Sequence, residues 1–174
     1  EQRRARAREA IAAAGLDWMV LFHPVSIRWL TGSDAKSYQE FQCLLVSAKP
    51  GPVSVLTRTG ERNEFRDDAH VDEIYTWGGS EPDDPIEALE QLARWHGILG
   101  SRVGIEVPAY YLHPHHYVRV KQLFGESSIT EATNLIHDLT LVKSPTELQY
   151  IREASRIGDL AMQRFVSVLA AGRT

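Results

Sequence analysis

The stretch LDWMVLFHPVSIRWLTGSD, residues 16–34, decides the fold of this chain. Residues 18–22 form a nearly continuous apolar run, which is typical of a β-strand covered on both of its faces. The His-Pro dipeptide that follows ends the strand, and residues 26–30 form a short helical turn that closes at Gly32. A buried strand followed directly by a helix is typical of an α/β fold.

The same alternation continues on both sides of this stretch. The first 14 residues are rich in Ala, Arg and Glu and predict a helix that ends at Gly15. Residues 41–47 and 53–57 read as strands that pair across the turn KPGP. The other expected elements are helices over 61–70, 85–96 and 114–124, strands over 72–77, 103–107 and 129–132, and an exit segment over 135–142. This order predicts an α/β fold, a mixed β-sheet flanked by helices.

The last segment, LVKSPTELQYIREASRIGDLAMQRFVSVLAAGRT at residues 141–174, carries its own helix start. Ser144 can accept from the Glu147 amide, the Glu147 side chain can reach back to the Ser144 amide, and Pro145 stands where a missing N–H costs nothing. The apolar residues that follow recur at helical spacing and predict an amphipathic helix of about seven turns. They are Leu148, Ile151, Met162, Phe165 and Leu169.

So long an apolar stripe needs a surface to pack against. We therefore expect two parts in this chain. The first is a complete domain over residues 1–142, and the second, over residues 143–174, is the first helix of a further domain whose body lies beyond this sequence.

Composition and charge narrow the classes of partner. The 174 residues are 43% hydrophobic and 24% charged, which is ordinary for a globular protein. The net charge of −4 gives no electrostatic reason to expect nucleic acid or an anionic membrane as a partner. The basic run at the N-terminus is interpreted as a solvated helix face; it consists of Arg3, Arg4, Arg6 and Arg8.

Cysteine content and hydropathy suggest the compartment. Cys43 is the only cysteine, so no internal disulfide can form, and the apolar run FQCLLV around it predicts a buried residue. No stretch approaches the roughly 20 apolar residues of a membrane span, and the N-terminus lacks the apolar core of a secretory signal. We expect a reducing, cytoplasmic location.

Three phrases of the sequence resemble one family. They are residues 16–34, the VGIE at residues 103–106, and LVKSPTELQYIREASRIGDLAMQ at residues 141–163. Together they resemble the N-terminal half of creatinase, prolidase and Xaa-Pro aminopeptidases, the pita-bread metallohydrolases. The last phrase is the most specific, because Lys143, Ser144 and Glu147 stand where the family joins its two domains.

The resemblance implies a fold and a division of labour. It implies an N-terminal domain of ribonuclease H-like architecture with no catalytic residue of its own. It also implies a catalytic domain that binds two divalent metal ions (Mn, Co or Zn) through two aspartates, a histidine and two glutamates beyond this chain. The parent protein would be a peptidase or amidinohydrolase in which metal-activated water attacks an amide or amidine carbon. The chain alone should be inactive and hold no cofactor.

The resemblance also implies a substrate-contacting loop. In the family's homodimers, the loop after the LTG-like turn reaches the partner's active site, and here that loop covers residues 33–40. Lys36, Tyr38 and Glu40 are the expected contact residues. Creatinases carry an arginine for the substrate carboxylate where this chain has Glu40, so a peptide or a cationic, amide or amidine substrate is expected, with Lys36 able to receive a carboxylate.

Other clusters favour structural interpretations. The triplet His113, His115 and His116 offers imidazoles, but adjacent helical residues point about 100° apart, so packing is favoured over a metal site. The acidic group around Asp67 and Asp72 is interpreted as solvated surface. Glu106 ends a buried strand, where a carboxylate must be paired, and an ion pair with Arg102 or an arginine of the first helix is expected.

The sequence is also compatible with two functions other than that of an enzyme domain. The first is a peptide- or protein-binding module from a catalytically inert relative of the same family. The second is a free-standing α/β ligand-binding domain in which the terminal helix acts as a lid. The metal ligands of a downstream sequence would favour the enzyme.

Overall fold

The computed structural model describes residues 1–34, 40–79, 82–107, 112–170 and 172. These residues form two compact units, Glu1–Leu139 and Thr140–Thr174.

The first unit is built on one six-stranded sheet with the strand order β4-β3-β2-β1-β5-β6. Strand β2 runs antiparallel to β1 and β3, and the other three pairings are parallel. The hairpin expected between the second and third strands is therefore confirmed. The strands are β1 (Trp18–Leu21), β2 (Cys43–Ser47), β3 (Ser54–Arg58), β4 (Glu73–Trp77), β5 (Val103–Ile105) and β6 (Ile129–Glu131).

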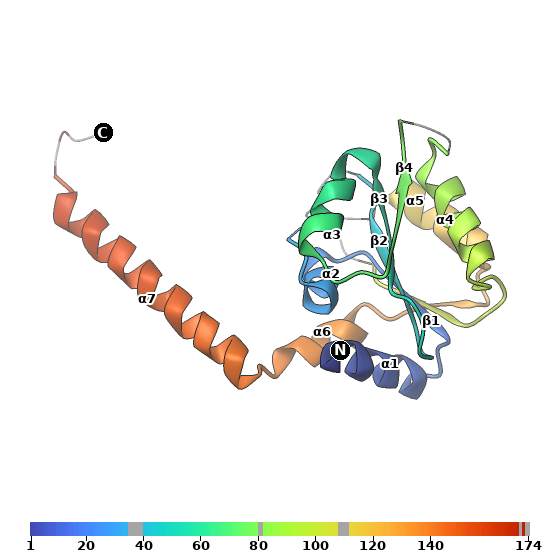
Figure 1. Cartoon of the computed structure of the whole chain (residues 1–174), viewed down its shortest axis with the longest axis horizontal. Coiled ribbons are helices and arrows are strands. Elements are labelled where there is room, and N and C mark those ends of the chain that lie inside the picture. Colours follow the sequence, from blue (N-terminus) through green and yellow to red (C-terminus); the bar gives the residue numbers. More distant parts are fainter. Residues whose placement is uncertain (35–39, 80–81, 108–111, 171, 173–174) are drawn as a thin grey trace. The chain divides into compact units, whose positions relative to one another are not determined.

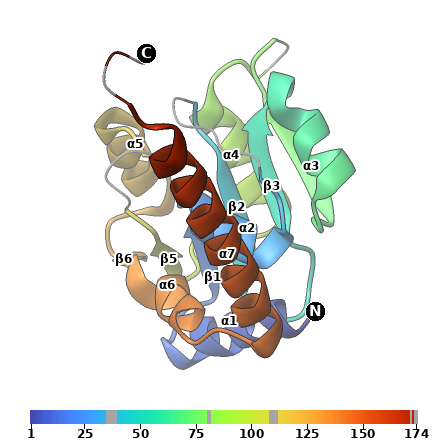
Figure 2. The ribbon, with the colours of Figure 1, turned by 90° about the vertical axis from the view of Figure 1, so that its left-hand side faces the viewer.

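Helices cover both faces of this sheet, as Figure 1 shows. Apolar side chains of α4 (Pro85–Trp95) and α5 (Pro114–Phe124) form one core cluster with the sheet. The opposite cluster is closed by α1 (Gln2–Ala13), α2 (Pro24–Thr31), α3 (Arg62–Asp68) and α6 (Asn134–Leu141). A 3-10 turn, η1 (Thr59–Glu61), precedes α3. Figure 2 shows β6, β5, β1, β2 and β3 following one another across the sheet. The predicted mixed sheet flanked by helices is confirmed.

Helix α2 begins two residues earlier than the sequence suggested. Pro24 is its first residue, where the absent N–H is not missed, and the His23 Nδ1 atom accepts from the Val25 amide at 3.1 Å. Gly32 ends the helix with φ of 80°, a left-handed conformation that favours glycine. The proline that ends the strand thus also starts the helix.

The buried carboxylate of Glu106 joins β5 to the turn between β1 and α2. Its Oε2 atom accepts from the Phe22 and His23 amides at 2.9 and 2.8 Å, and the Ser26 hydroxyl donates to Oε1 at 2.5 Å. The expected ion pair with an arginine was wrong, since Arg102 pairs with Asp17 at 2.9 Å instead. The Phe22 and His23 amides follow the last residue of β1 and lie outside its strand pairing. They satisfy the Glu106 carboxylate without a positively charged partner.

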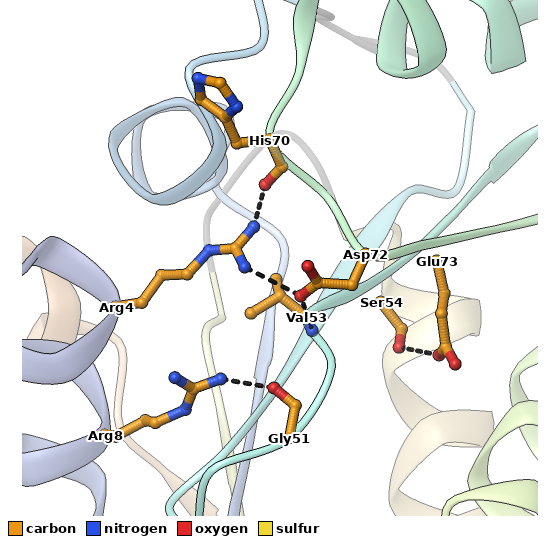
Figure 3. Close-up of polar contacts among 8 residues, drawn as sticks. All are labelled: Arg4, Arg8, Gly51, Val53, Ser54, His70, Asp72 and Glu73. Carbon is orange, nitrogen blue, oxygen red and sulfur yellow. Dashed lines mark hydrogen bonds and ion pairs between the residues drawn. The ribbon is translucent and has the colours of Figure 1, made fainter. Parts of the chain in front are cut away.

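Arg4 and Arg8 of α1 form contacts that hold the helix to the sheet. The Arg4 side chain is buried, pairs with Asp72 at 2.8 Å and donates to the His70 carbonyl (Figure 3). The same Asp72 carboxylate accepts from the Val53 amide at 2.7 Å. Arg8 donates to the Gly51 carbonyl at 2.6 Å. The solvated-face interpretation was therefore wrong for Arg4, because its long side chain reaches a carbonyl and a carboxylate oxygen just before β4.

The second unit consists mainly of α7 (Pro145–Val168), and the predicted helix start is confirmed. The Ser144 hydroxyl accepts from the Glu147 amide at 3.2 Å, and the Glu147 carboxylate accepts from the Ser144 amide at 2.7 Å. This reciprocal capping box fixes the helix start from local sequence alone.

We expect the substitution Arg4→Ala to lower the free energy of unfolding by about 2 kcal/mol, because it removes two hydrogen bonds of a buried charged group. Urea denaturation measures the change. The control is Arg62→Ala, which removes an exposed side chain and should change stability by less than about 0.5 kcal/mol. Equal effects of the two substitutions would contradict a structural role for Arg4.

Glu106 makes stability depend on pH in an unusual direction. Burial raises the pKa of Glu106 to about 7, against the lowering effect of its hydrogen bonds from Ser26, His23 and Phe22. The folded protein then binds this proton more tightly than the unfolded chain, so the stabilisation is full below the unfolded pKa and is lost as pH rises through 7. Relative to Glu106→Gln, we expect the wild type to lose about 2–3 kcal/mol between pH 5 and pH 8. Parallel stability profiles of the two proteins would refute this.

Candidate functional site

The loops that could form a site meet at one edge of the sheet. Strands β1, β3, β4, β5 and β6 are mutually parallel and end at this edge, whereas β2 begins there. The register places Leu44 beside Leu21 and Leu56 beside Cys43. Residues that leave β3 therefore lie close to those that enter β2.

Glu40 lies at this edge, next to the start of β2. Its carboxylate forms an ion pair with Arg58 at 3.1 Å. The neighbouring Phe41 carbonyl accepts from the Trp77 indole at 2.8 Å, and the Gln42 side chain accepts from the Thr57 hydroxyl at 3.0 Å. The end of the 33–40 loop is thus fixed to β3 and β4. Of the three expected contact residues only Glu40 is placed, since Lys36 and Tyr38 fall outside the described residues.

The beginning of the same loop is fixed by α2. The Thr31 hydroxyl donates to the Ile27 carbonyl at 2.8 Å and accepts from the Ser33 amide at 3.1 Å. Arg28 pairs with Asp34 at 2.7 Å, although both side chains are exposed. Ser26 of α2 donates a hydrogen bond to the buried Glu106 carboxylate. This contact fixes α2, and with it the residue from which the loop departs.

Arg58 is the site residue that the sequence reasoning missed. Its pairing with Glu40 partly compensates the acidic charge at this position, which weakens the substrate preference inferred from Glu40 alone. The signal was present in the sequence. Arg58 ends the strand that pairs with the strand entered from Glu40, and a hairpin places such residues at one edge.

The three histidines gather around the start of α5. The ring centroids of His115 and His116 lie 3.9 Å apart, and those of His113 and His115 lie 5.7 Å apart. His116 packs edge-on against Phe41 at 5.2 Å. Burial, and then the neighbouring cationic groups, lower the pKa of His116 to about 4, so this ring is neutral at pH 7. It packs as an uncharged ring against Phe41 just before β2.

The described residues do not match the metal site that the resemblance implies. Among them no three His, Cys, Asp or Glu side chains are arranged to hold a metal ion. The donor set of two aspartates, a histidine and two glutamates therefore has no counterpart in the described part of this chain. Burial also raises the pKa of the Cys43 thiol, which makes that group a poor nucleophile.

A membrane-spanning helix is likewise not found, since none of the described helices has the length and apolarity to cross a bilayer.

Known proteins with similar sequences and folds cover nearly all of this chain. An ectoine hydrolase of Halomonas elongata is 27% identical over 96% of this chain and 43% of its own length. The Xaa-Pro dipeptidase of Bacillus anthracis superposes with a TM-score of 0.78 at 21% identity, over 99% of this chain and 44% of that one. The N-terminal domain of the cytoplasmic peptidase PepQ of Mycobacterium tuberculosis gives 0.55 at 20% identity, over 79% and 98%.

The chain spans less than half the length of the curated relatives that it matches. The profile of the creatinase/prolidase N-terminal domain matches residues 3–151, which include the whole sheet and the first turns of α7. The chain therefore belongs to the creatinase/prolidase N-terminal domain family.

Proposed function

We propose that this chain is the non-catalytic N-terminal domain of a creatinase/prolidase-type hydrolase. The observation that carries the proposal is that curated relatives match nearly all of this chain with less than half of their own length. We propose the division at residues 142 and 143, so that α7 is the first helix of the catalytic domain. A capped, 24-residue amphipathic helix that forms a unit with little else supports this division.

The proposed task of the domain is to shape a substrate entrance in a homodimer. Loop 33–40 leaves α2 at a buried anchor and returns at the Glu40–Arg58 pair, so its two ends are held while its middle spans Lys36 and Tyr38. A loop fixed at both ends can present side chains to a neighbouring subunit at low entropic cost. We propose that Lys36 and Tyr38 contact the substrate of the partner subunit, and that Glu40 sets the charge at the rim.

The names of two relatives support a proposed substrate class. One is named an Xaa-Pro dipeptidase and another an ectoine hydrolase, so the proposed substrate is a peptide or a small amide or amidine. The two divalent metals and their ligands are proposed to lie in the downstream domain, and the location is proposed to be cytoplasmic. A peptide-binding module from an inert relative is the alternative.

Activity assays separate these functions. We expect the 174-residue chain to hydrolyse neither Xaa-Pro dipeptides nor ectoine in the presence of Mn²⁺, Co²⁺ or Zn²⁺. The longer gene product that contains it should hydrolyse at least one of them. Hydrolysis by the chain alone would overturn the proposal, and a longer product that binds these peptides without cleaving them would establish the alternative.

The Glu40–Arg58 pair gives a sharper test in the longer protein. We expect Glu40→Gln to free Arg58 for the substrate carboxylate and to raise kcat/KM for a free dipeptide relative to its C-terminal amide. Arg58→Ala should lower that ratio several-fold, because it removes the guanidinium that offsets the charge of Glu40. The matched control is Arg66→Ala, which breaks the exposed pair with Asp67 and should leave the ratio unchanged. If none of the three variants changes the ratio of kcat/KM for the free dipeptide to that for its amide, the Glu40–Arg58 pair does not line the substrate entrance.

A further inference from the structure

Strand β4 is an edge strand that lacks proline and lysine. It ends the strand order, and no described strand lies beside its outer edge. In Figure 1 it stands between α3 and α4. Its sequence EIYTW has no proline or lysine, the residues that commonly block edge pairing. Its one charged residue, Glu73, is committed inward to the Ser54 hydroxyl at 2.6 Å and to His96 at 3.0 Å. No strand that the structure describes pairs with the backbone groups of this edge, so this is where a further strand would add.

An apolar pocket opens between this strand and α4. Its volume is about 220 Å³, enough for one large apolar side chain. The walls that matter are Leu56 and Tyr75 from the sheet and Ala88, Leu92 and Trp95 from α4. Trp95 is 77% exposed, so a large indole stands at the pocket without being buried by the fold. Exposed aromatic surface next to an open strand edge is typical of a binding groove.

The end of this groove carries negative charge. A second hollow shares Pro82 and Gln91 with the apolar pocket and is lined by Asp83, Asp84 and Glu87. Asp84 is neutralised, because it caps α4 and pairs with Arg119 at 2.7 Å. Neither Asp83 nor Glu87 forms an ion pair with any residue that the structure describes. Asp83 is thus left without an ion pair beside the apolar pocket, whereas Glu87 interacts with the positive charge of Arg119 without forming a close ion pair.

We propose that this groove, formed by the outer edge of β4 and by α4, binds an extended segment of a partner protein in which an apolar side chain is followed by lysine or arginine. The segment adds a strand to β4 through main-chain hydrogen bonds, its apolar side chain enters the pocket beside Trp95, and its cation meets Asp83 and Glu87. A second copy of this chain fits less well, because the β4 edge offers another β4 no cation for these carboxylates.

Peptide titration of the full 174-residue chain tests the proposal. The probe is acetyl-Thr-Leu-Thr-Lys-Thr-Lys-Thr-amide, and binding is followed by ¹H–¹⁵N spectra of the Trp95 indole and of the backbone amides of β4. We expect saturable shifts at both places and at least tenfold weaker binding at high salt. A peptide with Glu in place of Lys should bind at least tenfold more weakly. A peptide N-methylated at alternate residues should not bind, because it cannot pair with the edge.

Variants of the chain locate the site. Trp95→Ala removes an exposed side chain, and Glu87→Lys reverses one of the two charges at the end of the groove. Each substitution should weaken binding of the probe at least tenfold without changing the circular dichroism spectrum. Glu9→Lys makes the same charge change on α1 and should leave the affinity unaltered. Equal binding of the Lys and Glu peptides, or of the N-methylated peptide, would overturn the proposal. The proposal would also be overturned if the backbone amide signals of β4 shifted with protein concentration in the absence of peptide. That result would identify a second copy of the chain as the occupant.

Discussion

The arrangement of the first unit depends on one buried carboxylate. Glu106 takes hydrogen bonds from two successive backbone amides and from the hydroxyl of Ser26, and so it joins the end of β5 to the turn that starts α2. Helix α2 ends at Gly32, from which the 33–40 loop departs. The point where that loop leaves α2 is therefore set by a group that burial keeps at a pKa near 7. An ordinary apolar residue at position 106 would leave the two amides without a partner.

Much of the fold could be predicted because its signals are local. The capping box at Ser144, the left-handed glycine at position 32 and the hairpin across KPGP each depend on residues within a few positions of one another. The partners of Arg4 and Glu106 could not be predicted in this way. They lie between 66 and 84 residues away along the chain, and only the packed sheet brings them together. Sequence reasoning correctly required a partner for Glu106 but chose the wrong chemistry for it.

The candidate site shows the same limit. The loop could be predicted from the resemblance to a family. The surroundings of Glu40 could not, because they depend on the pairing of β2 with β3, which brings Arg58 next to it. The contact assigned to Glu40 assumed an isolated charge, and the ion pair with Arg58 changes what that residue offers a substrate. Lys36 and Tyr38 remain predictions from the sequence. For the three histidines, the sequence favoured packing over a metal site, and their rings lie against one another in the structure.

The solitary thiol has a practical consequence. Cys43 lies wholly buried in the middle of the sheet, and burial disfavours its thiolate, so maleimide reagents should pass it by in the native state. Cysteines introduced at the surface would then be the only ones to react, without any need to replace the native residue. Pairs of fluorophores or spin labels attached in this way, one on the sheet and one on α7, would report the distance between the two units directly in solution.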